Sequence, residues 1–352
     1  MRIRRTFPLA LAVVIVAAAV TVAVQLRKNA PPEPARLLPG ADAFVYVNLG
    51  WVRKLNPDGG LPSVSHDPEY ERFIQATGFE FERDLDAAAF AVHYPASWPG
   101  GGTGSSAPEP RFSEVFIGKF DGAKLGAYLK QSAQSIENYH SVDIFTIPLE
   151  GRAFRVAILG VDSVACSNHD DPAVIRGIVD RSRRLASPFG GPAFLRRYYK
   201  QVQFDSPLWI VAHLQPSGPA FGGWSDVFSK PADIVISAGY NPLHLPLRSG
   251  PLHLRAEALT GSVDDARNIT DKVNTYLTMF HSAEGSVGGG SGTDSDVKAL
   301  FDSLQVRQEG DRATLNASIP PGFLRKMLAE SPEGTVSPIR QEPKGQAPSG
   351  SR

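Results

Sequence analysis

The chain has 352 residues, with 36 basic and 36 acidic side chains, so its formal net charge is zero. This balance gives no electrostatic basis for nucleic-acid binding, which depends on clustered Lys and Arg. Cys166 is the single cysteine. An intrachain disulfide is therefore excluded, and the fold must be held together by a hydrophobic core.

The N-terminal region contains an uncharged apolar run from Phe7 to Val24. A helix rises ~1.5 Å per residue, so this run would cover about 27 Å, close to the ~30 Å hydrocarbon thickness of a bilayer. Basic residues lie on both sides of the run: Arg2, Arg4, Arg5, Arg27 and Lys28. We therefore predict a membrane anchor over residues 1–29, followed by a large water-soluble body.

The basic charges before the apolar run outnumber those after it, which favours a cytoplasmic N-terminus. The prediction is a single-pass protein of the inner (cytoplasmic) membrane, with its body in the periplasm or outside the cell. A cleaved signal peptide is the alternative, because the basic start and the apolar length fit one as well. We favour a retained anchor because the small-x-small cleavage site is loose, offered only by Ala17 and Ala19 or by Val22 and Val24.

Two segments outside the anchor are predicted to lack helices and strands. Residues 30–40 begin Ala-Pro-Pro-Glu-Pro, which predicts a stiff, extended, Pro-rich spacer that holds the body away from the membrane. Residues 331–352 contain four prolines among Gly, Ser, Gln and charged residues. Because this tail has little apolar material to offset the entropy of ordering, we predict that it is disordered.

Residues 41–185 alternate between strand and helix patterns. Asp67-Pro68 is typical of a helix start and Gly78 of a helix end, and Asp121 caps a second helix. In chain order, we predict strands over 44–49, 88–94, 114–120, 142–149 and 154–159, a short strand through Cys166, and helices over 67–78, over 121–136 and from 171 onward.

Residues 205–330 repeat this order of elements. Ser262 and Asp265 resemble a capping box at the start of a long helix whose apolar residues keep helical spacing. We predict strands over 208–214, 233–240, 252–259, 301–308 and 313–319, a weak helical turn over 224–228, and helices over 262–280 and 323–328.

Each half therefore reads as strand, short helix, two strands, long helix, hairpin and helix. This order predicts that 41–185 and 205–330 are copies of one unit, joined by a linker helix within 186–204. The predicted fold class is α+β. It consists of two similar units, each with an antiparallel sheet covered by helices on one face, after an N-terminal transmembrane helix.

The best catalytic candidates are Cys166, His169 and Asp170, which lie where a strand gives way to a helix. Cys166 could be a nucleophile with His169 as its base, or these residues could hold a metal ion. The alternative is structural: Cys166 continues an apolar strand, and acidic residues favour the start of the next helix. We favour the structural interpretation because neither a closed metal site nor a nucleophile, base and orienting group is complete.

Known catalytic and nucleotide-binding motifs are missing from the sequence. It has no G-x-S-x-G, H-E-x-x-H, C-x-x-C or Walker A pattern and no dinucleotide fingerprint. We therefore predict no catalytic residues beyond the weak candidates above, no cofactor and no metal site.

Two stretches carry a resemblance to known proteins. Residues 36–47 read Arg-Leu-Leu-Pro-Gly-Ala-Asp-Ala-Phe-Val-Tyr-Val and follow the anchor and the Pro-rich segment. Residues 77–86 read Thr-Gly-Phe-Glu-Phe-Glu-Arg-Asp-Leu-Asp. Together they resemble uncharacterised bacterial membrane-anchored envelope proteins, including the DUF3352-like group. The resemblance covers about the first 185 residues and implies location and architecture only, because that group has no established activity.

These observations predict a membrane-anchored extracytoplasmic protein that is not an enzyme. Its body would be a binding or structural module of the cell envelope, with an envelope protein, a lipid or a cell-wall component as its partner. The competing hypothesis is an extracytoplasmic hydrolase or thiol enzyme centred on Cys166 and His169.

Overall fold

The computed structural model describes residues 30–55, 66–94, 110–149, 151–183, 190–215, 226–240, 250–287 and 294–329. The predicted anchor over 1–29 and the predicted tail over 331–352 lie outside these ranges. Within the described ranges, no helix is both long enough and apolar enough to cross a membrane.

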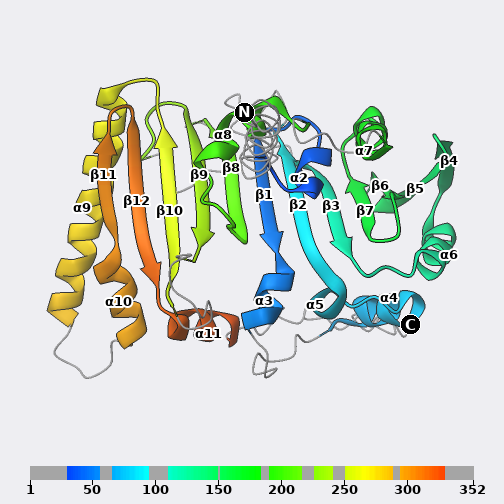
Figure 1. Ribbon diagram of the computed structural model, residues 1–352, viewed down its shortest axis with the longest axis horizontal. Coiled ribbons are helices and arrows are strands. Elements are labelled where there is room, and N and C mark those ends of the chain that lie inside the picture. The colour runs from blue at the N-terminus through cyan, green and yellow to red at the C-terminus, as the bar shows by residue number, and fades with distance from the viewer. Residues whose placement is uncertain are drawn as a thin grey trace, which may run out of the picture.

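A single antiparallel sheet of twelve strands dominates the molecule (Figure 1). The strands are β1 Ala43–Asn48, β2 Leu85–His93, β3 Arg111–Gly118, β4 Ser135–Tyr139, β5 Val142–Leu149, β6 Arg152–Ile158, β7 Ser163–Ser167, β8 Leu208–Leu214, β9 Ala232–Gly239, β10 Leu252–Leu259, β11 Gln305–Glu309 and β12 Arg312–Ile319. Their order across the sheet is β11-β12-β10-β9-β8-β1-β2-β3-β7-β6-β5-β4.

Helices connect and cover these strands. They are α2 Glu33–Leu37, α3 Leu49–Leu55, α4 Pro68–Thr77, α5 Phe81–Asp84, α6 Gly122–Ser132, α7 Ala173–Arg183, α8 Ala193–Tyr198, the 3₁₀ turn η1 Tyr199–Gln201, α9 Val263–Val287, α10 Ser295–Ser303 and α11 Pro321–Ala329. The chain is thus a mixed α+β protein with a large antiparallel sheet, as the coarse fold-class prediction states.

The helix ends that local sequence predicted are confirmed. The Asp67 side chain accepts hydrogen bonds from the backbone of Glu69 and Tyr70 at the start of α4, and Gly78 ends α4 with a left-handed φ of 73°. Asp121 caps α6 in the same way. Ahead of α9, the backbone N–H of Asp265 donates to the Ser262 hydroxyl at 3.2 Å, which is the first hydrogen bond of a capping box. The Ser262 hydroxyl in turn donates to the Asp265 carboxylate at 2.7 Å.

The prediction of separate sheets is wrong. β1 pairs with β2 on one side and with β8 on the other, so the two halves of the chain share one continuous sheet. Rings from both halves stack across this junction, with Tyr46 of β1 and Trp209 of β8 at a centroid distance of 5.5 Å. Both strands are apolar on both faces, so neither would be stable as a solvent-exposed sheet edge.

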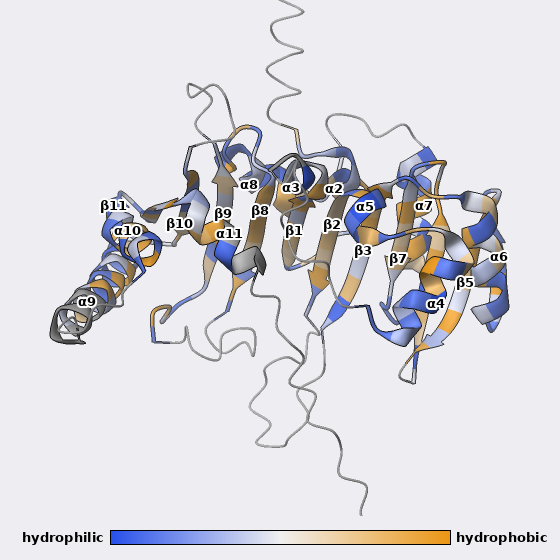
Figure 2. Cartoon of the chain, turned by 90° about the horizontal axis from the view of Figure 1, so that it is seen from below, coloured by the Kyte–Doolittle hydropathy of each residue, from blue (hydrophilic) through white to orange (hydrophobic). Residues whose placement is uncertain are grey.

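The prediction that helices cover one face is also wrong, because both faces carry helices. Successive strand residues point to opposite faces of a sheet. We define face 1 as the side of Phe44, Tyr46 and Trp209, which forms the largest buried cluster together with side chains from α2, α7 and α8. Face 2 is the opposite side, where α6 and α9 pack. Figure 2 shows α2, α7 and α8 above the sheet and α4 and α9 below it.

Residues 30–40 are not an extended spacer. Residues 33–37 form the short helix α2, and Ala35, Leu37 and Leu38 are buried within the face 1 cluster. Pro34 lies within the first turn of α2, where a missing N–H and a fixed φ are tolerated. The Pro-rich composition suggested an extended segment, but burial of three apolar side chains outweighs that tendency.

Two further boundaries differ from the predictions. Helix α6 ends at Ser132, and Ile136 belongs instead to the edge strand β4, with 47% of its surface exposed. Phe301 lies in α10 rather than at the start of a strand. Within the predicted linker, residues 193–201 form α8 and η1, and Leu195 and Tyr198 are buried in the core.

Candidate functional site

The structure does not bring Cys166 and His169 together as a nucleophile and a base. Cys166 points to face 2 and is only 6% exposed, among apolar side chains of α6, β5 and β6. Burial, and next the Glu114 carboxylate, raises the pKa of the Cys166 thiol well above its usual value. A reactive cysteine needs the opposite, a lowered pKa and access to solvent.

His169 belongs to a polar cluster on face 1. Its ring packs edge-on against that of His93, with centroids 5.1 Å apart. The His93 Nε2 atom lies 3.1 Å from the Ser113 hydroxyl, which lies 3.0 Å from the Ser167 hydroxyl. Asp170 forms an ion pair with Arg111 at 3.0 Å. Asp170 therefore pairs with Arg111 and not with His169.

The polar cluster of His93, Ser113, Ser167 and His169 has the residue types of a Ser–His site, but its hydroxyls are inaccessible. Ser113 is 0% and Ser167 is 2% exposed. Burial, and next the adjacent His169, lowers the pKa of His93 to about 4. A buried hydroxyl cannot meet a substrate, so these side chains satisfy one another's hydrogen-bonding groups and stabilise the β2–β3–β7 region.

A second polar group lines a pocket of about 430 Å³ between α8, β8 and β9. His213 Nδ1 lies 2.7 Å from Asp233 Oδ1, and the Tyr198 hydroxyl donates to the other oxygen of the same carboxylate. Burial and then the Asp233 contact raise the pKa of Tyr198 to about 12. The nearby Thr260 hydroxyl donates to backbone carbonyls at 2.8 Å, so it is not free to act as a nucleophile for this His–Asp pair.

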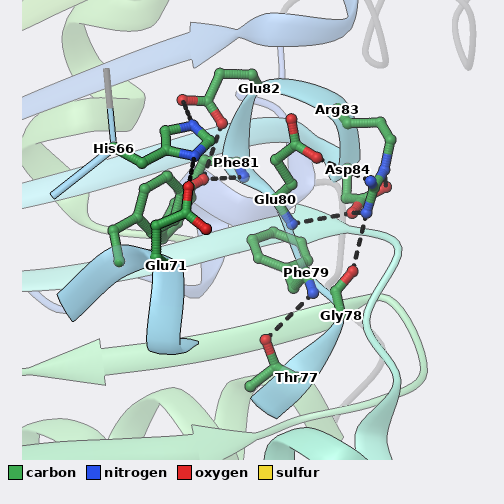
Figure 3. A network of polar contacts seen from close by, with 11 residues as sticks. His66, Glu71, Thr77, Gly78, Phe79, Glu80, Phe81, Glu82, Arg83 and Asp84 are labelled. Atoms are coloured by element: carbon green, nitrogen blue, oxygen red, sulfur yellow. Dashed lines mark hydrogen bonds and ion pairs between the residues drawn. The ribbon is translucent and has the colours of Figure 1, made fainter. Parts of the chain in front are cut away.

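A third network joins α4 to α5 (Figure 3). His66 Nδ1 lies 3.0 Å from Glu71, and its Nε2 lies 3.6 Å from Glu82. The Tyr70 hydroxyl donates to Glu82 at 2.8 Å and accepts from the Phe81 backbone at 2.7 Å, and burial raises its pKa to about 12. Because these groups satisfy one another, the network holds the 77–86 segment in place rather than presenting a reactive group.

None of these groups forms a metal centre. Across the described ranges, no three His, Cys, Asp or Glu side chains are arranged to hold a metal ion.

Face 2 carries the most unusual arrangement in the molecule. The register of the sheet aligns one residue from each of the twelve strands in a single row across this face. From one edge to the other the row reads Ile136, Phe145, Val156, Cys166, Glu114, Phe90, Val45, Ile210, Ile236, Ala256, Leu315 and Val306. Every member is apolar except Glu114.

The two rows beside it are apolar across the central strands as well. From β3 to β9 they read Phe112, Val92, Ala43, Ala212 and Ile234 on one side, and Phe116, Ala88, Val47, Leu208 and Ala238 on the other. The helices on face 2 lie toward the two ends of the sheet, with α9 at one end and α4 and α6 at the other (Figure 2).

We call the middle of this face the central patch and define it as Val45, Val47, Phe90, Val92, Ile210 and Ile236. All six side chains are partly exposed, whereas their neighbours on face 1, such as Phe44 and Trp209, are fully buried. Phe90 and Ile236, at the two ends of the patch, also pack against buried clusters on face 2. Contiguous apolar surface is a common feature of ligand and partner sites, so the central patch is the candidate site on this face.

Glu114 lies at one end of the central patch. Phe90 and Cys166 are its partners across the sheet, and Phe112 and Phe116 precede and follow it on the same face of β3. Among the described residues, no hydrogen bond or ion pair engages its carboxylate. Burial raises the pKa of Glu114 to about 7.

Sequence reasoning missed Glu114, although a signal was present. Residues 111–118 alternate so that Phe112, Glu114 and Phe116 share a face, which places an acid between two aromatic side chains. The pairing of this strand with β2 and β7 could not be read from the sequence. His213 and Asp233 were also missed, because twenty residues separate them and only the β8–β9 pairing brings them together.

Comparisons with known proteins place the chain in no family. No protein-family profile matches it, and no curated protein matches it either. Solved structures of TP0453 in crystal forms I, III and IV resemble it, with 8%, 10% and 11% identity and TM-scores of 0.39, 0.42 and 0.40. The matches cover 85%, 86% and 85% of this chain and 97%, 99% and 97% of those chains. At these values the likeness carries no argument about function.

Proposed function

We propose that this protein is a membrane-anchored, extracytoplasmic binding module that holds an apolar or amphiphilic ligand against the central patch. The observation that carries the proposal is the partly exposed apolar surface of Val45, Val47, Phe90, Val92, Ile210 and Ile236. Binding sites for such ligands are mostly apolar surfaces with a few polar groups that fix orientation, which is the composition found here.

The location belongs to the same proposal. The apolar run from Phe7 to Val24, its basic flanks and the resemblance of residues 36–47 to envelope proteins support an inner-membrane anchor with the body outside the cytoplasm. An envelope lipid, an envelope protein or a cell-wall component would then be within reach of the body. A ligand with a long apolar chain fits the central patch best, because the patch continues across neighbouring strands without interruption.

We also propose that the two halves of the sheet are copies of one unit. Read outward from the centre, the order is β1-β2-β3-β7-β6-β5-β4 in one half and β8-β9-β10-β12-β11 in the other, so β5 and β4 have no counterpart. In each half the third strand of this order is followed along the chain by a helix, α6 or α9. Superposition of the β1–β3 backbone on the β8–β10 backbone tests this, and a failure to superpose would contradict it.

Photo-crosslinking of the full chain in membrane vesicles tests the binding proposal. The probe is a long-chain alkyl alcohol with a photoactivatable group on its chain. We expect crosslinked peptides from β1, β2 and β8, in addition to peptides from the anchor, which report partition of the probe into the membrane. Ile210→Glu places a charge in the central patch and should abolish the strand crosslinks while those of the anchor remain.

The matched control is Val161→Glu. Val161 is 88% exposed in the turn between β6 and β7, so the same charge is added away from the central patch. This variant should crosslink like the wild type. Strand crosslinks that are missing in the wild type, or equally strong in Ile210→Glu, would contradict the proposed function.

A further inference from the structure

We propose that Glu114 selects the head group of the ligand, so that the central patch takes an amphiphile with a cationic, ammonium-type head. This inference rests on the proposed function and deepens it by naming the chemistry at one end of the patch. The apolar chain would lie along the row that starts at Phe90, and the ammonium group would meet the Glu114 carboxylate.

The geometry of the row supports this assignment. Phe90, Val45, Ile210 and Ile236 follow Glu114 on successive strands. Neighbouring strands lie ~4.8 Å apart, so the apolar path from Glu114 to Ile236 is roughly 19 Å long. A chain with one polar end matches a path with one polar end, whereas a wholly apolar ligand would leave the carboxylate without a partner.

Charge complementarity decides the sign of the head group. A carboxylate among apolar side chains is unfavourable unless an opposite charge or hydrogen-bond donors meet it. The neighbours of Glu114 on its own and the adjacent strands are aromatic apart from the Cys166 thiol, and no side chain within the described ranges forms an ion pair with it. A ligand ammonium group would supply both the charge and the donors, and an anionic head group would be repelled.

Competition against the photoactivatable alkyl alcohol tests the inference. Dodecylammonium, dodecanol and dodecyl sulfate share one chain length and differ in charge. With the wild-type chain, we expect dodecylammonium to suppress the β1, β2 and β8 crosslinks at a concentration on the order of tenfold lower than dodecanol. Dodecyl sulfate should be the weakest of the three competitors.

Glu114→Gln keeps the shape of the side chain and removes its charge. In this variant the three competitors should differ only by their partition into the membrane, which the anchor crosslinks report. Glu114→Asp keeps the charge and should retain a preference for the ammonium compound. Glu309→Gln, at the exposed end of β11, is the control and should behave like the wild type.

The outcomes separate the two proposals. If the wild type gives no strand crosslinks at all, the proposed function fails. If the strand crosslinks form but dodecylammonium has no advantage over dodecanol, only the head-group inference is overturned. An ammonium preference that survives unchanged in Glu114→Gln would also overturn it, because another group would then be responsible.

Discussion

Two half-buried titratable residues make the stability of the protein depend on pH in opposite directions. Burial lowers the pKa of His93 from 6.5 to about 4, so the unfolded state binds the extra proton first and stability is lost as pH falls through this window. Burial raises the pKa of Glu114 from 4.5 to about 7. The stabilisation of the folded state by protonated Glu114 is fully present below pH 4.5 and is lost as pH rises through 7.

The loss of stability as pH rises through 7 comes from Glu114 alone among the groups that line this part of the sheet. Across the sheet it faces Phe90 and Cys166, and Cys166 is the only titratable group among its strand neighbours. The adjacent helix α6 packs toward this region through buried Leu125 and Leu129, while its lysines are exposed. Burial is the cause of the raised Glu114 pKa, and no positive charge among the described residues offsets it.

Replacing Glu114 with Gln should make the protein more stable at high pH only. At pH 8 the wild type must keep an ionised carboxylate among apolar groups, and a shift from 4.5 to about 7 corresponds to up to about 3 kcal/mol. At pH 4 both chains are neutral at this position and should unfold at similar urea concentrations. Urea denaturation at both pH values measures the difference, and equal stabilities at pH 8 would contradict the prediction.

The thiol of Cys166 should react with a thiol reagent only when the protein unfolds. The side chain is 6% exposed, and its raised pKa leaves little thiolate. The matched control is Val161→Cys in a Cys166→Ala background, because position 161 is 88% exposed and should react at once. Native labelling of Cys166 at the rate of the control would restore the thiol-enzyme hypothesis.

At the scale of single elements, α2 should contribute to stability despite its length of five residues. Leu37, the last residue of α2, is 3% exposed in the face 1 cluster, so Leu37→Ala should cost roughly 2–5 kcal/mol of unfolding free energy. Leu149→Ala, at a position that is 54% exposed, is the control and should cost much less. Urea midpoints compare the two, and an equal effect would mean that α2 is not part of the core.

The whole sheet should unfold as one cooperative unit, because residues from both halves share the face 1 cluster. Two buried thiols report this: Cys166 in β7, and Ala258→Cys in β10, placed in a Cys166→Ala background. Protection against a thiol reagent should disappear at the same urea concentration for both. Separate midpoints would show that the two halves fold as independent domains.

The membrane anchor is the other prediction at this scale. If residues 7–24 form a retained transmembrane helix, the protein should stay in the membrane fraction after a high-salt wash, because salt screens charge but does not release buried apolar residues. The mature chain should then begin at or near Met1. A soluble protein whose N-terminus lies between Val20 and Ala30 would instead identify a cleaved signal peptide.

Local sequence patterns predicted many of the helix ends and strand bounds. Asp67, Asp121 and the Ser262–Asp265 pair predicted three helix starts, and Gly78 predicted a helix end, because capping depends on residues within one turn. The strands 208–214 and 252–259 were predicted with their observed bounds, because the apolar, β-branched run of the first and the alternation of apolar and polar residues in the second are local properties.

How these elements pair depends on contacts between residues that are distant in the chain. The continuous sheet depends on β1 meeting β8, two strands far apart in the chain, and no local pattern specifies that contact. The pairing of β7 with β3 and β6 places Cys166 on face 2, away from His169 on face 1. The β2–β3, β1–β2 and β1–β8 pairings together align Glu114 with Phe90, Val45 and Ile210, so the candidate site exists only because of strand register.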